Sequence, residues 1–375
     1  MYDVYLVLIM GIEPLRSKIL FILHLPPPVH GAAMVGKYIH DSRVVNEAFE
    51  CRYVNLAMAR NLEDIGKVGL LRGIKKEVES FRPDLVYITP NAKGGAFYKE
   101  FVIVQMLKRM GCRVVANYHN KGVRMRQGRW LDDKLYRAFF KDIKVILLAE
   151  SLYSDICKYV DRENVFICPN GIPEMLSSEP LIGRHNDVPH ILFLSNLIVS
   201  KGVLVLLDAL RMLKEHGYSF VCDFVGGETA EIDADRFQRE AESRCLTGIA
   251  VYYGKRYGEE KETFFKCADM FAFPTYYDSE CFPLVLLEAM QHGLPCISTN
   301  EGGIPDIVRK GVNGFLVDTK SGLVDAQELA DAIATLLDDK ELRCKMGKEG
   351  YRIFHEQFTL PQFERRITEI LKDCL

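Results

Sequence analysis

Short runs of apolar residues recur along the chain and alternate with amphipathic stretches almost throughout. In the first half they read ILFILHL, FECRYVNLA, DLVYITPN, RVVANYHN, KVILLAE and NVFICPN, and in the second half HILFLSN, FVCDFVGG, IAVYYGK, MFAFPTY, PCIST and GFLVD. The Val, Ile, Leu and Phe of these runs are nearly continuous, which is typical of strands covered on both faces. Strands that alternate with amphipathic stretches predict βαβ units and parallel sheets, so we expect an α/β protein.

A polar segment separates the two sets of strands. Residues 177–189 (SSEPLIGRHNDVP) show no hydrophobic period and contain two Pro, which is typical of a linker. A chain of 375 residues with 48% hydrophobic content suits two domains with a core each. We predict one Rossmann-like domain over residues 1–180, with residues 1–15 as an extension or tail, and a second over residues 181–357. Helical spacing continues at 325–337, 340–358 and 361–375.

Composition excludes several classes of protein. The net charge of −3 gives no general reason to expect a nucleic-acid partner. The 11 Cys are scattered singly, without a C-x-x-C pair or a Cys/His cluster that would indicate zinc, and this usage favours a reduced, cytoplasmic setting. The apolar run from Val4 to Ile12 is too short to span a bilayer and lacks the flanks of a signal peptide.

Two carboxylates eight residues apart mark the stretch DSECFPLVLLEAMQHGLPCISTNEGGIPD. Glu280 stands in a loop, whereas Glu288 lies in an apolar run that suits a short helix beginning near Phe282 and Pro283. Unpaired N–H groups at such a helix start attract an anion such as a phosphate. A second glycine-rich helix start follows at residues 302–305. We expect Glu280, between the two ends, to accept hydrogen bonds from sugar hydroxyls, and Glu288 to bind a ribose diol. Taken alone, either glutamate is more readily a solvated side chain.

A lysine stands at another helix start. Strand HILFLSN leads through Leu197 to Lys201 and Gly202, and a helix is predicted over residues 203–216. A Lys beside a Gly at a helix N-terminus is well placed to pair with a diphosphate. The alternative is an ordinary solvated lysine.

The E-x7-E spacing, followed by EAMQHGLPCIST and GGIPDIV, resembles the signature of the family 4 retaining glycosyltransferases, also called glycosyl transferases group 1. The resemblance spans most of the second half and is weaker in the first. It implies the GT-B fold, in which two Rossmann-like domains face a cleft and the last helix, here 358–375, packs back on the N-terminal domain. It also implies a nucleotide-diphosphate sugar as donor, retention of anomeric configuration, and neither a cofactor nor a bound metal.

The resemblance assigns roles to individual residues. Glu280 orients the sugar, Lys201 pairs with the diphosphate, and His119, which ends strand RVVANYHN, assists beside the reacting sugar. Outside this context a lone His is more often structural. The expected donor-binding residues are Glu288, Asn196, Gly31, Gly226, Arg256, Cys281, Phe282, Pro283 and Leu284.

The chain departs from the family pattern at two turns. Asn196 stands where the family has an Arg five residues before the Lys, and Asn cannot form a charged bidentate fork. We expect Arg256 or the helix dipoles to compensate. In the first turn His30 replaces a family glycine, so that Gly31 alone lets a ligand approach closely. The P-N-G-I turn at residues 169–172 predicts a positive φ at Gly171.

The segment from Lys121 to Lys144 carries eight Lys and Arg against three Asp, a local excess of five. Apolar and aromatic residues are interleaved with these charges: Met125, Trp130, Leu131, Tyr136, Phe139 and Phe140. This pattern suits an anionic membrane surface or a phosphorylated acceptor. A solvated helix face with its apolar side in the core explains it equally well. Membrane contact would place the enzyme peripherally at the inner face of the membrane. Nucleic acid is disfavoured because no recognised module accompanies the segment.

The sequence thus predicts transfer of a sugar to an acceptor hydroxyl in cell-surface polysaccharide or glycolipid assembly, with a carbohydrate or lipid-linked acceptor. A glycosidase also uses two carboxylates but gives no reason for Lys201 and Gly202. Two further alternatives keep the same fold. One is a non-catalytic nucleotide-sugar binding protein, which Asn196 and Pro283 favour, and the other is a sugar-nucleotide epimerase.

Overall fold

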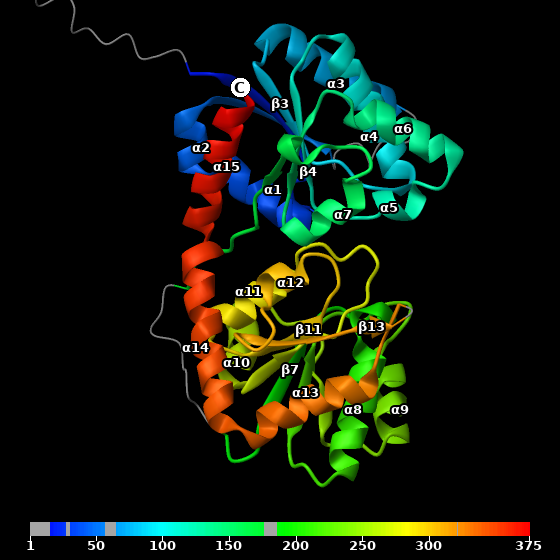
Figure 1. Cartoon of the computed structure of the whole chain (residues 1–375), viewed down its shortest axis with the longest axis vertical. Helices are drawn as coiled ribbons and strands as arrows, with labels where there is room; N and C mark the ends of the chain where they lie inside the picture. Colours follow the sequence, from blue (N-terminus) through cyan, green and yellow to red (C-terminus); the bar gives the residue numbers. More distant parts are fainter. Residues whose placement is uncertain (1–15, 28–30, 57–64, 176–185, 321) are drawn as a thin grey trace, which may run out of the picture.

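The computed structural model describes residues 16–27, 31–56, 65–175, 186–320 and 322–375. Two α/β domains face each other in the elongated molecule (Figure 1). The predicted extension over residues 1–15, His30 and most of the predicted linker lie outside the described residues.

The first domain is built on a six-stranded parallel sheet in the order β2-β1-β3-β4-β5-β6. Its strands are β1 Lys18–Leu23, β2 Glu50–Asn55, β3 Leu85–Ile88, β4 Val114–Tyr118, β5 Lys144–Leu147 and β6 Val165–Ile167. Its helices are α1 Gly31–Asp41, α2 Arg43–Ala48, α3 Ile65–Phe81, α4 Gly94–Arg109, α5 Val123–Arg126, α6 Trp130–Phe140 and α7 Tyr153–Ile156.

The second domain has a parallel sheet in the order β12-β11-β10-β7-β8-β9 and a small β13-β14 hairpin. Its strands are β7 His190–Leu194, β8 Val221–Val225, β9 Ala250–Tyr252, β10 Met270–Ala272, β11 Cys296–Thr299, β12 Gly314–Val317, β13 Thr319–Lys320 and β14 Leu323–Val324. Its helices are α8 Val203–Glu215, α9 Ala234–Ser243, α10 Gly258–Cys267, α11 Leu284–Gln291, α12 Ile304–Ile307, α13 Ala326–Asp338 and α14 Lys340–Gln357. Numbered from β7, this is the doubly wound order, which places ligands at the carboxyl ends of the strands.

Nearly continuous burial explains why the strands were readable. Ile19 to Leu23 of β1 and Val115 to Tyr118 of β4 are buried on both faces of the first sheet. Each of the twelve apolar runs becomes one of the strands of the two large sheets, so the prediction of two parallel sheets is confirmed. Apolar side chains on both faces of a sheet must be covered by helices on both faces. Those helices are formed by the amphipathic stretches between successive strands.

The last two helices connect the domains. Helix α14 packs on the second domain, and after Phe358 the chain continues as α15 Leu360–Cys374 along the first domain (Figure 1). Phe363, Ile367 and Leu371 are fully buried in the same cluster as Phe21 of β1. The predicted crossing of the last helix is therefore confirmed.

The crossing passes over the P-N-G-I turn. The Ile172 N–H donates to the Phe358 carbonyl at 3.0 Å, and the Leu360 N–H donates to the Ile172 carbonyl at 2.8 Å. Gly171 is not among the glycines with positive φ, so the predicted turn geometry is wrong. A Cβ on Gly171 would instead lie 2.8 Å from the Cβ of Phe363 and would also strike the Thr359 carbonyl. Glycine is needed here because the crossing chain approaches closely.

Candidate functional site

A cavity of about 890 Å³ lies where the carboxyl ends of the two sheets meet, and both domains line it. Its position and size are those expected of a ligand site in such folds. The structure brings all the predicted site residues to this one cavity: Gly31, His119, Asn196, Lys201, Gly226, Arg256, Glu280, Cys281, Phe282, Pro283, Leu284 and Glu288. Their individual roles stay predictions.

Glu280 and Lys201 form an ion pair on the second-domain wall. Glu280 is only 8% exposed, so it is not a solvated loop acid. The Thr275 hydroxyl also donates to its carboxylate at 3.4 Å, and the Lys201 ammonium lies 4.6 Å from the centre of the Tyr277 ring. Gly202, with φ of 93°, starts α8 beside Lys201, and a Cβ there would meet Pro274. Glu280 and Lys201, two of the three predicted catalytic residues, are thus held together by an ion pair that is mostly buried.

The second glycine-rich helix start does not line the cavity as expected. A Cβ on Gly303 would lie 2.8 Å from Ala149 and also strike the Cys281 carbonyl, and one on Gly302 would strike the Glu280 carbonyl. The Gly303 N–H donates to the Cys281 carbonyl at 2.7 Å. These glycines therefore support the back of the Glu280 loop. Helix α12, which they precede, has only four residues.

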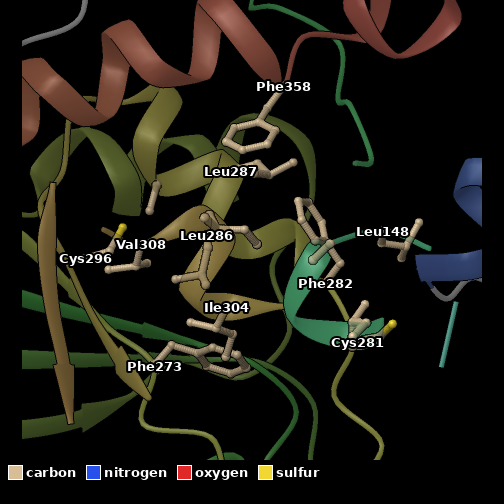
Figure 2. Packing of buried hydrophobic residues seen from close by; sticks show 14 of the residues in the cluster. Leu148, Phe273, Cys281, Phe282, Leu286, Leu287, Cys296, Ile304, Val308 and Phe358 are labelled. Carbon is tan, nitrogen blue, oxygen red and sulfur yellow. The ribbon is translucent and has the colours of Figure 1, made fainter. Parts of the chain in front are cut away.

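Side chains of the Glu280 loop pack away from the cavity into the core. Cys281 and Phe282 are 4% and 5% exposed. Figure 2 shows them with Leu148 of the first domain on one side and Phe358 beyond, and the rings of Phe282 and Phe358 are 5.8 Å apart. Burial raises the pKa of the Cys281 thiol, which keeps it neutral. Cys281 and Phe282 therefore anchor the loop, and their backbone is the part a ligand can meet.

Glu288 projects from α11 toward the cavity and pairs with Lys261 of α10 at 2.8 Å. Tyr38 of α1, from the opposite domain, lines the same region. Burial, together with the nearby Glu288 carboxylate, raises the pKa of the Tyr38 hydroxyl. Glu288 is thus a partly exposed carboxylate that is paired with a lysine. The sequence did not predict Lys261 as its ion-pair partner.

The turns after β7 and β8 touch each other. A Cβ on Gly226, whose φ is 153°, would strike the Ser195 carbonyl, so this glycine is required by the neighbouring strand. The Gly227 N–H donates to the Asn196 side-chain oxygen at 3.1 Å. The side-chain oxygen of Asn196 therefore accepts a hydrogen bond within the protein, and its side-chain N–H groups are the part that can donate to a ligand.

The Arg256 side chain contacts the start of helix α10, which follows it in the chain. Its guanidinium donates to the Lys255 carbonyl at 2.9 Å and lies 3.7 Å from the Glu260 carboxylate. Lys255, next to it in the chain, also lines the cavity, although no binding role was predicted for this lysine.

Neutral polar side chains at strand ends form part of the first-domain wall. His119 and Asn120 follow β4, and Asn91 follows β3. The Glu100 carboxylate, fully buried in α4, accepts from the Asn91 backbone N–H at 2.6 Å and from its side-chain amide at 3.0 Å. Asn120 donates to the Asn91 side-chain oxygen at 3.2 Å. These residues lie directly after apolar strand runs, which was the available sequence signal.

At the first βα turn, Gly31 begins α1 and faces open space, with no atom within 4 Å of an added Cβ. The described residues thus leave room beside Gly31, and close approach of a ligand there stays a prediction.

Polar contacts bridge the two domains at the rim. Lys93 pairs with Asp278 at 2.8 Å, which lowers the pKa of that carboxyl, and Lys121 pairs with Glu301. Asp306 accepts from the Ser151 hydroxyl at 2.6 Å and from the Glu150 backbone N–H at 3.1 Å. Charged and polar side chains therefore connect the two domains close to the Glu280 loop.

The basic segment includes both buried and exposed apolar side chains. Tyr136, Phe139 and Phe140 of α6 are buried in the core, as a solvated amphipathic helix requires. Trp130 and Leu131, however, are 71% and 54% exposed. The Lys134 ammonium lies 4.0 Å from the centre of the Trp130 ring. Within the described residues, no helix is long and apolar enough to cross a membrane.

Residues 181–353 match the family model of glycosyl transferases group 1, so this part of the chain is a glycosyl transferases group 1 domain. Among curated relatives, N-acetyl-alpha-D-glucosaminyl L-malate synthase of Bacillus anthracis is 38% identical over 26% of this chain and 25% of its own length. D-inositol 3-phosphate glycosyltransferase of Corynebacterium glutamicum (strain R) is 32% identical over 42% of this chain and 37% of its own. The chain therefore matches well under two thirds of these relatives.

A solved structure of Anabaena Alr3699/HepE in complex with UDP superimposes with a TM-score of 0.71, at 16% identity, over 95% of this chain and 100% of that one. At this level of identity the likeness establishes the fold. The chain has the GT-B fold of glycosyltransferases.

Proposed function

We propose that the protein is a retaining glycosyltransferase, which moves a sugar from a nucleotide-diphosphate sugar to an acceptor hydroxyl. The observation that carries the proposal is the buried Glu280–Lys201 pair on the wall of a cleft between two sheet edges. Burial of this pair lowers the local dielectric constant, which strengthens electrostatic interactions with a charged leaving group.

The costly event in this reaction is departure of the diphosphate, because negative charge accumulates on the leaving oxygen. In the proposed mechanism Lys201 and the N–H groups at the start of α11 stabilise that charge. Glu280, fixed by Lys201 and Thr275, accepts hydrogen bonds from sugar hydroxyls, and Glu288 holds the ribose diol. The protein's own cations and N–H groups suffice for this assistance, so we propose that no metal takes part.

The acceptor binds against the first-domain wall in this proposal. His119, at the end of β4, faces the cavity opposite the Glu280 loop and donates a hydrogen bond near the reacting centre. The neutral amides of Asn91 and Asn120 suit a carbohydrate, because their N–H groups can donate to hydroxyl oxygens while their side-chain oxygens accept from the protein.

A panel of nucleotide sugars with a thermal-shift readout tests the proposal. A donor that binds only the folded chain raises the melting temperature by mass action, and UDP-glucose and GDP-mannose are the first probes. The panel's binder should yield product of unchanged anomeric configuration, and EDTA should not slow transfer. Donor binding without transfer would favour a non-catalytic binding protein. A change in the sugar of the donor itself would favour an epimerase.

We further propose that the enzyme lies at the inner face of a membrane and uses a carbohydrate or lipid-linked acceptor in polysaccharide or glycolipid assembly. The exposed Trp130 and Leu131, with Arg124 and Lys134 nearby in the chain, support this location. Aromatic and basic side chains together favour the interface of an anionic bilayer.

A further inference from the structure

Four cationic side chains line the cavity, and all belong to the second domain: Lys201, Lys255, Arg256 and Lys261. Lys201 pairs with Glu280, Arg256 with Glu260, and Lys261 with Glu288. Among the described residues, no carboxylate lies within ion-pair distance of Lys255. Three of the four positive charges on the wall are therefore already balanced by protein carboxylates, and that of Lys255 is not.

The position of Lys255 is as informative as its charge. Its chain lies across the glycine turn after β8, because a Cβ added to Gly227 would strike the Lys255 Cε and would lie 2.9 Å from the Asn196 side-chain oxygen. Lys255 thus comes over the same turn that Asn196 touches from the end of β7. Its ammonium can enter the space that a longer cationic side chain at residue 196 would occupy.

We propose that Lys255 is the second cation of the diphosphate site and substitutes, from the end of β9, for the positive charge that Asn196 lacks. This inference rests on the proposed function. A nucleoside diphosphate carries more than one negative charge, and the Lys201 charge is shared with Glu280. Lys255 supplies the charge that the other three cations do not, and its side chain passes directly over Gly227.

Arg256, the residue that the sequence favoured for this task, is less suited. Its guanidinium is held by the Lys255 carbonyl and the Glu260 carboxylate. Lys255 itself is exposed and lines the cavity, so its ammonium is accessible to a phosphate. The adjacent residues therefore have different roles: Lys255 binds phosphate, and Arg256 fixes the start of α10.

Titration calorimetry with UDP, GDP, ADP and inorganic pyrophosphate tests the assignment on the whole chain. We expect Lys255→Ala to weaken binding of pyrophosphate and of the preferred nucleoside diphosphate about tenfold, the usual effect of losing one charge-assisted hydrogen bond. The matching nucleoside should bind as before. Lys255→Arg should stay within about threefold of the unmodified chain, and the dependence of affinity on salt should become shallower only in the Ala variant.

Asn196→Arg in the Lys255→Ala background provides a rescue that a merely structural lysine would not show, and it should recover most of the lost affinity. Lys348→Ala, which removes an exposed charge from α14, is the matched control and should bind normally. Equal diphosphate binding by the unmodified chain and Lys255→Ala would overturn this inference and leave the proposed function standing. No binding of any diphosphate by the unmodified chain would overturn both.

Discussion

The two walls of the cavity use different chemistry. The second-domain wall carries every Lys and Arg among the described lining residues and is shaped by glycines such as Gly202 and Gly226. The first-domain wall offers His119, Asn91, Asn120 and Tyr38, with no cation among its described lining residues. In our proposal the second-domain wall holds the anionic diphosphate, and the first-domain wall holds the hydroxyl groups of the acceptor.

This difference explains why the second-domain wall was easier to predict from the sequence than the first-domain wall. A diphosphate needs cations and N–H groups at helix starts, and these leave recurrent patterns such as Lys201-Gly202. Hydroxyl groups are bound by Asn, His and Tyr at strand ends, which many α/β proteins carry for other reasons. Variants that separate the two walls therefore test the interpretation most directly.

The largest effect is expected at the Glu280–Lys201 pair. Glu280→Gln should lower the transfer rate by about 10² to 10³, because a preorganised charge at the reacting sugar is lost. Lys201→Ala should also destabilise the fold by about 3 kcal/mol, since it leaves the Glu280 carboxylate buried without its cation. Initial rates and denaturant unfolding measure the two effects.

The double variant Lys201→Ala/Glu280→Gln separates these effects. It should regain most of the lost stability and none of the activity, because no unpaired charge remains buried. Equal destabilisation of the single and double variants would contradict the ion-pair account.

An effect of about tenfold is expected on the outer face of the first domain. Trp130→Ser/Leu131→Ser should weaken binding to anionic phosphatidylglycerol vesicles about tenfold, because two exposed apolar side chains no longer enter the interface. Flotation at several salt concentrations measures it. Val312→Ser, an exposed apolar residue of the second domain, is the control. If the unmodified chain does not bind these vesicles at any salt concentration, the membrane proposal is wrong.

A smaller effect is expected behind the first-domain wall. Glu100→Gln turns an acceptor into an amide donor that faces the Asn91 N–H groups, so the loop carrying Asn91 should shift. The KM for acceptor should rise about fivefold, with donor affinity unchanged. Steady-state kinetics with the donor and the acceptor varied in turn measure the two KM values separately. Glu79→Gln, exposed on α3, should change neither, and a shift in donor affinity alone would mean that the two walls are not separate.

The fold was largely predictable because strands buried on both faces must be apolar, and a continuous apolar run has few other interpretations. The second-domain site was predictable for the chemical reason given above. Sequence reasoning failed where one residue type serves two purposes. Gly303 and Gly171 read as ligand or turn glycines, but they accommodate close approach of protein backbone. No role was predicted for Glu100, because a single Glu in a helix gives no sign in the sequence that it is buried against the loop carrying Asn91.

The crossing of α15 has a consequence for synthesis of the protein. Phe363, Ile367 and Leu371 complete the cluster around Phe21, although the ribosome makes them only after the whole second domain. At ordinary elongation rates the first domain waits on the order of ten seconds for them. During that interval the nascent chain carries an unfilled apolar groove, which is a natural target for a chaperone that binds during translation.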